Sequence, residues 1–325
     1  MKEVIVGANF PRDSEGKVYH MGVRLGEVAN RILTVGDHVR ARRIAKYLDS
    51  EEESGHPLFE QSSQRGFLTI TGRYKGVPVS IIAIGMGNCM MDFFIRESRA
   101  SVKGTMAIIR FGSCGSLSPD APAGAVIIPK AGYCIRRNLD YFSEAPLYPQ
   151  LKDKPYLFSG TFSADREITR LLTTEIESAL SPLEKEQGLL VGPVLSSGLN
   201  ADGCSFYSSQ GRTDTNFWDD NEGVLQEIVS TYPETHSIEM ETSMLFHLAN
   251  CAHQPIRAAG CMQVFADRIG NNFIRPEIVA ALEPVVGKAC LDALIQIEVE
   301  DEMEAAGTVW EPLFEKVDKS LDCNE

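Results

Sequence analysis

Short apolar runs alternate along this chain with segments whose apolar positions recur at helical spacing. Strands are expected at residues 31–35, 67–74, 77–84, 105–110, 125–129, 131–135, 189–197 and 255–265. Helices are expected at residues 38–48, 88–102, 165–180, 218–232, 240–251 and 276–299, with Ser163 as a plausible N-terminal cap of the third. Lys75-Gly76 predicts a hairpin turn between two of the strands. This alternation predicts an α/β sheet with helices on its faces.

The pattern shows no internal repeat and no clear domain boundary, so residues 1–298 are expected to form one domain. Residues 298–325 hold ten acidic residues against two lysines, which is −8 of the chain's net charge of −14. Residues 299–325 are therefore expected to form an acidic, solvated and partly disordered tail. Its apolar residues Trp310, Leu313 and Phe314 could still dock on the domain.

Composition excludes several classes of function. The acidic balance argues against a nucleic-acid partner, because phosphate backbones require basic surfaces. No apolar run reaches the length of a membrane span, and no signal region begins the chain, so a cytoplasmic protein without a membrane partner is expected. The eight cysteines and six histidines have no metal-ligand spacing, and no bound metal is expected.

The segment from Arg110 to Gly115 is the strongest chemical signal. It follows the apolar run Met106–Ile109, so a guanidinium is expected at the carboxyl end of a buried strand, where it needs an anionic partner. Gly112 and Gly115 permit close backbone approach, and Ser113 adds a hydroxyl. The pattern predicts one wall of an anion site, with an internal ion pair as the alternative.

Two other arginines stand beside glycines. Gly36 lies between a strand and a helix, where free N–H groups can bind an anion, and Arg40 follows in the first helical turn. Arg65 precedes Gly66 just before a strand. Three such arginines would form a phosphate cage, since guanidinium forks match phosphate oxygens. Ordinary turns with solvated arginines remain the alternative.

Two polar segments suit a nucleoside. Gln210 and Arg212 flank a glycine and could read a flat ring with an O–C–N–H edge such as uracil, with Phe206 stacking on its face. At a strand-to-helix junction, Glu239 and Glu241 could accept hydrogen bonds from sugar hydroxyls, while the thioether of Met240 packs on an apolar face. A polar surface loop and dipole-favoured helix acids are the alternatives.

These motifs, in this order, resemble nucleoside phosphorylase family I and most closely its uridine phosphorylase branch. The resemblance runs from about His20 to Lys288 and rests on six elements. They are GDxxR at 36–40, SxR at 63–65, GMG at 85–87, RxGSCG at 110–115, QxR at 210–212 and EMET at 239–242. The resemblance implies a single-domain fold with a mixed central β-sheet, a distorted barrel, flanked by helices.

The resemblance also assigns roles. The phosphate ligands would be Gly36, Arg40, Arg65, Arg110 and Ser113. The ribose contacts would be His20, Met240 and Glu241. The base would be held by Phe206, Gln210, Arg212 and Arg268. Catalysis would rest on Arg212, Gln210, Glu241 and Arg110.

The activity that follows is reversible phosphorolysis of uridine to uracil and ribose 1-phosphate, with inorganic phosphate as co-substrate and no cofactor. His20 and Arg65 would be lent by a neighbouring subunit, so a homo-oligomer is expected, with a dimer favoured.

Three departures keep alternatives open. Ser113 stands where the uridine branch more often has threonine, and Gly66 where some hexameric uridine enzymes keep a cation-binding glutamate. Asp267 stands where the purine enzymes use an aspartate as general acid. A purine nucleoside phosphorylase using Asp267, a nucleosidase that uses water, and a non-catalytic nucleoside-binding protein are therefore the rival interpretations.

Overall fold

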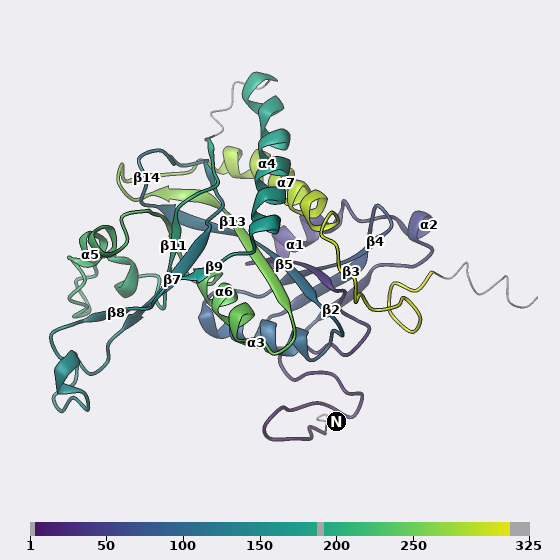
Figure 1. Cartoon of the computed structure of the whole chain (residues 1–325), viewed down its shortest axis with the longest axis horizontal. Helices are drawn as coiled ribbons and strands as arrows, with labels where there is room; N and C mark the ends of the chain where they lie inside the picture. Colours follow the sequence, from purple (N-terminus) through teal and green to yellow (C-terminus); the bar gives the residue numbers. More distant parts are fainter. Residues whose placement is uncertain (1–3, 187–191, 313–325) are drawn as a thin grey trace, which may run out of the picture.

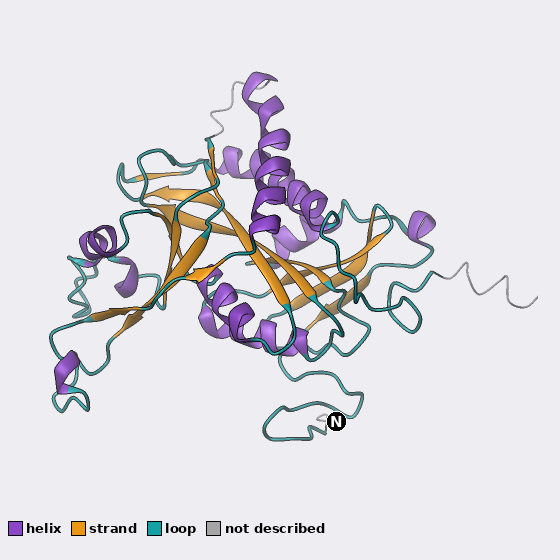
Figure 2. Cartoon of the chain, viewed as in Figure 1, coloured by secondary structure: helices purple, strands orange, loops and turns teal. Residues whose placement is uncertain are grey.

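The computed structural model describes residues 4–186 and 192–312, which form a large mixed sheet with helices on both faces (Figures 1 and 2). The helices are α1 (His38–Ala45), α2 (Glu51–Ser54), α3 (Asn88–Arg99), α4 (Arg166–Glu186), α5 (Val224–Thr231), α6 (Thr242–Cys251) and α7 (Pro276–Leu294). The first seven strands are β1 (Arg31–Val35), β2 (Phe59–Ser62), β3 (Leu68–Tyr74), β4 (Val77–Ala83), β5 (Met106–Ser116), β6 (Val126–Ile127) and β7 (Ala131–Arg137). The others are β8 (Tyr156–Phe158), β9 (Phe162–Ser163), β10 (Val194–Leu195), β11 (Leu199–Gly203), β12 (Thr235–Glu239), β13 (Ile256–Asp267) and β14 (Asn272–Phe273).

Strand β5 organises the sheet. The main strand order is β2-β3-β4-β1-β5-β12-β11-β7-β8. The first half of β5 pairs in parallel with β1, its last residues pair antiparallel with β12, and β13 runs parallel beside almost all of it. The path through the described strands ends at β2 and β8 without closing, so the mixed α/β sheet is confirmed but is not a closed barrel.

Helices cover the two faces of the sheet because the strands at its centre are apolar on both sides. All five residues of β1 are buried, a pattern typical of a parallel strand covered on both faces. Helix α4 lies beside α7 on one side of β13, while α6 and α3 lie on the other (Figure 1). Helix α1 packs against α7 and β4, which places its first turn beside the central strands.

Strand β5 does not end at Arg110 as predicted but continues to Ser116. The apolar run stops at Ile109, and this placed the predicted end of the strand at Arg110, yet β13 supplies a pairing neighbour for residues 111–116 as well. Arg110 is therefore an interior residue of a long central strand, with its charge buried inside the sheet.

Several element boundaries also differ from the predictions. Asp165, and not Ser163, caps α4, because its Oδ1 accepts a hydrogen bond from the Ile168 N–H at 3.0 Å. The helix expected at 218–232 begins at Val224, and the last helix ends at Leu294. The strand expected at 189–197 is reduced to β10, and residues 187–191 lie outside the described part of the chain. Strands β2, β8, β9, β11 and β14 were missed, and β12 was anticipated only as the strand before the junction at Met240.

The start of the acidic tail packs on the domain instead of extending into solvent. Trp310 is only 2% exposed, and its carbonyl accepts hydrogen bonds from the Arg73 guanidinium. Glu302 pairs with Arg31 at 2.6 Å. Leu313, Phe314 and the rest of the tail lie outside the described residues. No helix that the structure describes combines the length and apolar character of a membrane span.

The buried Trp310 predicts that this packing stabilises the fold. Trp310→Ala should lower the free energy of unfolding by about 3 to 5 kcal/mol, as expected for removal of a buried aromatic side chain. The matched control is Trp218→Ala, since Trp218 is the chain's other tryptophan and is 66% exposed. Urea denaturation followed by circular dichroism measures both, and equal effects of the two substitutions would contradict docking of the tail.

Candidate functional site

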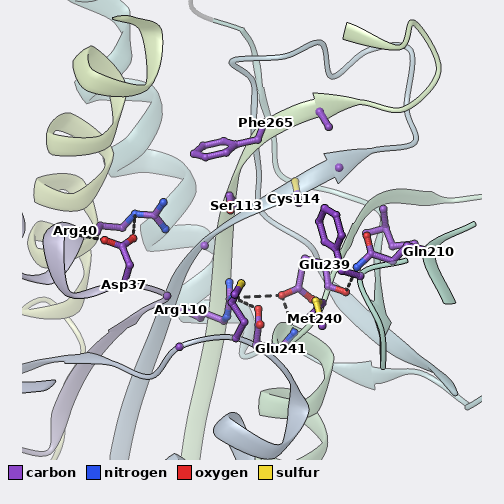
Figure 3. Close-up of a pocket in the computed structure, with 18 of the residues that line it drawn as sticks. Asp37, Arg40, Arg110, Ser113, Cys114, Gln210, Glu239, Met240, Glu241 and Phe265 are labelled. Atoms are coloured by element: carbon purple, nitrogen blue, oxygen red, sulfur yellow. Dashed lines mark hydrogen bonds and ion pairs between the residues drawn. The ribbon is translucent and has the colours of Figure 1, made fainter. Parts of the chain in front are cut away.

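A cavity of about 340 Å³ lies where β5, β12 and β13 meet the loops that follow β1, β4 and β11 (Figure 3). The structure brings nine of the predicted site residues to its wall: Gly36, Arg40, Arg110, Ser113, Phe206, Gln210, Arg212, Met240 and Glu241. Figure 3 shows Arg40 at one end of the cavity and Gln210 at the other, with Arg110, Met240 and Glu241 between them. Residues far apart in the sequence therefore share one site.

Arg110 is buried and held by acidic side chains. Its Nη2 donates to the Glu241 carboxylate and lies 3.6 Å from Glu239 Oε2. Nη1 has no hydrogen-bond partner among the described residues. A Cβ on Gly112 would lie 1.6 Å from this Nη1, so only glycine leaves room for the guanidinium at the cavity wall.

Glu239 joins this cluster to the start of α6. Its carboxylate accepts hydrogen bonds from the backbone N–H groups of Glu241 and Thr242, at 2.9 and 3.0 Å. Asn200 donates to it from β11 at 2.6 Å. Because Glu239 satisfies N–H groups at the start of a helix, it fixes the direction in which the next residues enter the cavity.

Burial and charge shift the protonation of this cluster. Burial raises the pKa of Glu241 to about 7, although Arg110 opposes the rise. For Arg110, burial acts to lower the pKa, but Glu241 and Glu239 outweigh it and the pKa is raised. Arg110 is therefore a permanent positive charge, while Glu241 can exchange a proton near neutral pH.

One end of the cavity holds Arg40. Asp37 caps α1 by accepting a hydrogen bond from the Arg40 N–H at 2.8 Å. The buried Arg40 guanidinium donates through Nε to Glu283 at 2.6 Å and lies over the Phe111 ring at 5.0 Å. Gly36 immediately precedes the cap, so its backbone faces the same space.

The end of the cavity away from Arg40 presents the amide of Gln210 and the guanidinium of Arg212. Arg212 Nη1 donates to Gln210 Oε1 at 2.5 Å, and its guanidinium stacks on Phe206 at 3.7 Å. Arg268 donates to the Gln210 carbonyl at 3.1 Å from behind this pair. Burial, together with Arg268, lowers the pKa of Arg212 to about 10. The predicted Gln210–Arg212 pair and its supporting arginine thus lie together.

Two predicted site residues lie elsewhere in the single chain. His20 pairs through Nδ1 with Glu97 at 2.7 Å and stacks on Phe93. Arg65 donates to the Tyr19 hydroxyl and, with Tyr19, lines a second cavity of about 670 Å³. Neither residue lines the first cavity, so within one chain they do not join the other candidates.

Asp267, the general acid of the purine interpretation, accepts side-chain hydrogen bonds from residues only a few positions away along the chain. Its Oδ1 accepts hydrogen bonds from the N–H groups of Ile269 and Gly270, at 3.0 and 2.8 Å. It is not among the residues that line the cavity. In this conformation the carboxylate holds a turn between β13 and β14 instead of facing the site.

Sequence reasoning missed three residues that shape the site. Asp202 is fully buried in β11 and accepts hydrogen bonds from Asn88 and from the Met244 N–H. Asn88 also donates to the Met240 carbonyl, which ties the start of α3 to the loop before α6. Glu283 on α7 holds Arg40. The strand that holds Asp202 reads LNADG, so its polar residues gave no distinctive sequence signal for a buried acid.

Comparisons with known proteins agree with this geometry. Residues 30–286 match a family model described as "Phosphorylase superfamily". A curated uridine phosphorylase from Thermococcus kodakarensis is 30% identical over 316 residues, which cover 96% of this chain and 99% of that protein. A DeoD-type purine nucleoside phosphorylase from Geobacillus kaustophilus is 36% identical over 110 residues, which are only 43% of its length.

Solved structures give the same picture. One, from work on two diverse uridine phosphorylases of the oomycete Phytophthora capsici, has a TM-score of 0.84 and 36% identity, covering 91% of this chain and 100% of that one. A Trypanosoma brucei nucleoside phosphorylase has a TM-score of 0.71 at 21% identity, covering 89% of this chain, and shares the fold.

The raised pKa of Glu241 predicts a pH dependence of stability. Its folded value of about 7 exceeds the ordinary 4.5, so between these values the folded chain binds more protons than the unfolded chain. The contribution of Glu241 to the free energy of unfolding therefore falls as pH rises through this window. Glu241→Gln removes that fall, so the free energy of unfolding of the variant, relative to that of the wild type, should rise between pH 4.5 and about pH 7.

Urea unfolding at several pH values measures this difference. Glu60→Gln changes an exposed carboxylate paired with Arg42. Its free energy of unfolding should therefore vary with pH in parallel with that of the wild type. Parallel pH profiles for wild type and Glu241→Gln would show that Glu241 does not take up a proton on folding.

Proposed function

The chain belongs to the phosphorylase superfamily, and on the geometry of its site we propose that it catalyses reversible phosphorolysis of uridine to uracil and ribose 1-phosphate. The observation that carries this proposal is the order of groups in one cavity. The Arg40 guanidinium stands at one end, the Arg110–Glu241 pair in the middle, and the amide–guanidinium pair of Gln210 and Arg212 at the other end. The uridine phosphorylases of Thermococcus kodakarensis and Phytophthora capsici, similar over nearly the whole chain, support the same activity.

Inorganic phosphate would bind between Arg40 and Arg110, beside the Ser113 hydroxyl and the Gly36 backbone. Because Nη2 of Arg110 is held by Glu241, the unpartnered Nη1 is the nitrogen left for an anion. Arg110 would then join phosphate to Glu241.

Ribose would lie beside Met240 and Glu241. The thioether offers an apolar contact to the sugar ring, and the carboxylate accepts a hydrogen bond from the 2′-hydroxyl. Glu241 is preorganised for this by the Gly87 N–H, which donates to its Oε1, and by Arg110.

Uracil would be read by Gln210 and Arg212 with Phe206 on its face. In the reaction the glycosidic C1′–N1 bond breaks and its electron pair leaves with uracil, while a phosphate oxygen bonds to C1′. The proton of hydrogen phosphate ends on the released uracil. The negative charge that develops on the base is stabilised by Arg212, with Arg268 and Gln210 in support.

Phosphate is a co-substrate in this scheme, and neither a metal nor an organic cofactor takes part. The activity would serve pyrimidine salvage in the cytoplasm. The purine alternative is less well supported, because Asp267 caps a turn. The DeoD-type purine relatives are also matched over only 43% to 66% of their own length, against 99% for the uridine phosphorylase of Thermococcus kodakarensis.

A homodimer would complete the site. His20 and Arg65 lie together with Tyr19 on one face of the chain, away from the cavity their roles require. If Arg65 binds phosphate and His20 contacts the ribose 5′-hydroxyl, both must do so in the cavity of a second copy of the chain.

Incubation with uridine, with and without inorganic phosphate, tests the activity. Uracil and ribose 1-phosphate should form only when phosphate is present, and inosine should react far more slowly. Release of uracil in phosphate-free buffer would indicate a nucleosidase, preference for inosine a purine enzyme, and binding of uridine without turnover a non-catalytic protein.

The shared site predicts complementation between two damaged chains. Arg212→Ala should cost about 3 kcal/mol of transition-state stabilisation, and Arg65→Ala should raise the KM for phosphate. When the two variants are co-expressed with different tags and purified as a heterodimer, one of its two sites has both arginines, so activity should return.

The exposed α4 residue Arg170 supplies the control, since Arg170→Ala should leave activity unchanged. A heterodimer no more active than the average of its two parents would mean that Arg65 does not act in the site of the other subunit.

A further inference from the structure

Glu283 is a buried acid next to the proposed phosphate site. It lies on α7, is only 4% exposed, and its two carboxylate oxygens are both used. Oε1 accepts from Arg40 Nε at 2.6 Å, and Oε2 accepts from Arg43 Nη1 at 2.5 Å. Both arginines come from α1, so one carboxylate joins the two helices.

We propose that Glu283 is a positioning residue that holds the Arg40 guanidinium toward phosphate, with Arg43 holding Glu283 in turn. This assignment rests on the proposed function, because it gives Arg40 a phosphate to bind. A free arginine side chain samples many rotamers and loses that freedom when it binds an anion. An arginine already fixed at Nε avoids this loss, which favours phosphate binding.

The packing of the two helices fixes this geometry. Ile44 lies one turn after Arg40 on α1, and Gly287 lies one turn after Glu283 on α7. A Cβ on Gly287 would lie 2.6 Å from Ile44 Cγ1, so the glycine is what permits the helices to approach this closely. The close approach brings Glu283 to Arg40, and the Phe111 carbonyl accepts from Nη1 at 3.4 Å on the other side.

The charges of the three side chains remain suitable for an anion. Glu283 alone would neutralise Arg40 and weaken its attraction for phosphate. Arg43 supplies a second positive charge, so the buried carboxylate of Glu283 leaves the pair of arginines with a net charge of +1. The Asp37 carboxylate, 3.9 Å from Arg40 Nε, is 55% exposed, so solvent screens most of its opposing charge. Arg43 therefore both satisfies the buried carboxylate and preserves the positive potential of the site.

Positioning and simple electrostatics predict opposite results for Glu283→Gln. Removal of a negative charge beside the site should strengthen phosphate binding if only charge matters. If Glu283 positions Arg40, phosphate binding should weaken, because the amide accepts from only one arginine and repels the other through its NH₂ group.

The experiment measures inorganic phosphate by isothermal titration calorimetry and by the rise in Tm that it causes, together with both KM values. For Glu283→Gln, the phosphate Kd and KM should rise roughly tenfold, the size typical of one charge-assisted hydrogen bond. The KM for uridine should stay within about twofold, because the base end of the cavity is untouched. Glu60→Gln, an equal charge change on an exposed strand residue, should leave phosphate binding unchanged.

A second pair of variants covers the case in which Glu283→Gln does not fold. Arg42 and Arg43 are neighbours on α1 with equally exposed side chains, 45% each, but only Arg43 contacts Glu283. Arg43→Gln should weaken phosphate binding, whereas Arg42→Gln should not, although both remove one positive charge from the same helix.

Phosphate binding by Glu283→Gln as tight as in wild type or tighter, or equal effects of the two arginine substitutions, would overturn the proposal. A wild-type chain that binds phosphate but releases no uracil would contradict the proposed function alone, and the phosphate affinities would still decide the role of Glu283. A wild-type chain that binds no phosphate would overturn both.

Discussion

The burial of Arg110 inside the central strand is the constraint on which the site depends. A guanidinium removed from water is unfavourable unless charged partners compensate, and Glu241 and Glu239 supply that compensation here. These acids in turn need fixed positions, which the start of α6 and the Gly87 N–H provide. The need to neutralise one buried cation therefore explains the arrangement of β5, β12, α6 and the loop before α3.

The sheet topology converts this ion pair into a site with two distinct ends. The first half of β5 pairs with β1, and its last residues pair with β12. The loops after β1 and β12 therefore open onto the same space. The first of these loops leads into α1 with Arg40, and the second into α6 with Glu241. The amide and guanidinium of the segment after β11 close the far end. An anion site and a site for a polar ring are thus held at a fixed separation by the sheet.

Local sequence identified the residues whose chemistry stands out from their neighbours. Arg110 was recognisable because a charge interrupts an apolar run, and Gln210 and Arg212 because they flank a glycine. The end of β5 was misplaced because the apolar run stops at Ile109, whereas pairing with β13 keeps the residues up to Ser116 in the sheet. Glu283 could not be found in this way, since an acid in a helix is ordinary and its meaning comes from Arg40, which lies 243 residues away. The position of Arg65 relative to the cavity likewise depends on contacts beyond one chain.

A crystal structure of the chain with inorganic phosphate and uridine tests the central claim most directly. The account predicts one phosphate in the cavity in hydrogen-bond contact with both Arg40 and Arg110, with Arg110 still touching Glu241 and uracil at Gln210 and Arg212. Phosphate bound at another place, or an Arg110 that contacts only its acidic neighbours while the nucleoside binds elsewhere, would contradict it.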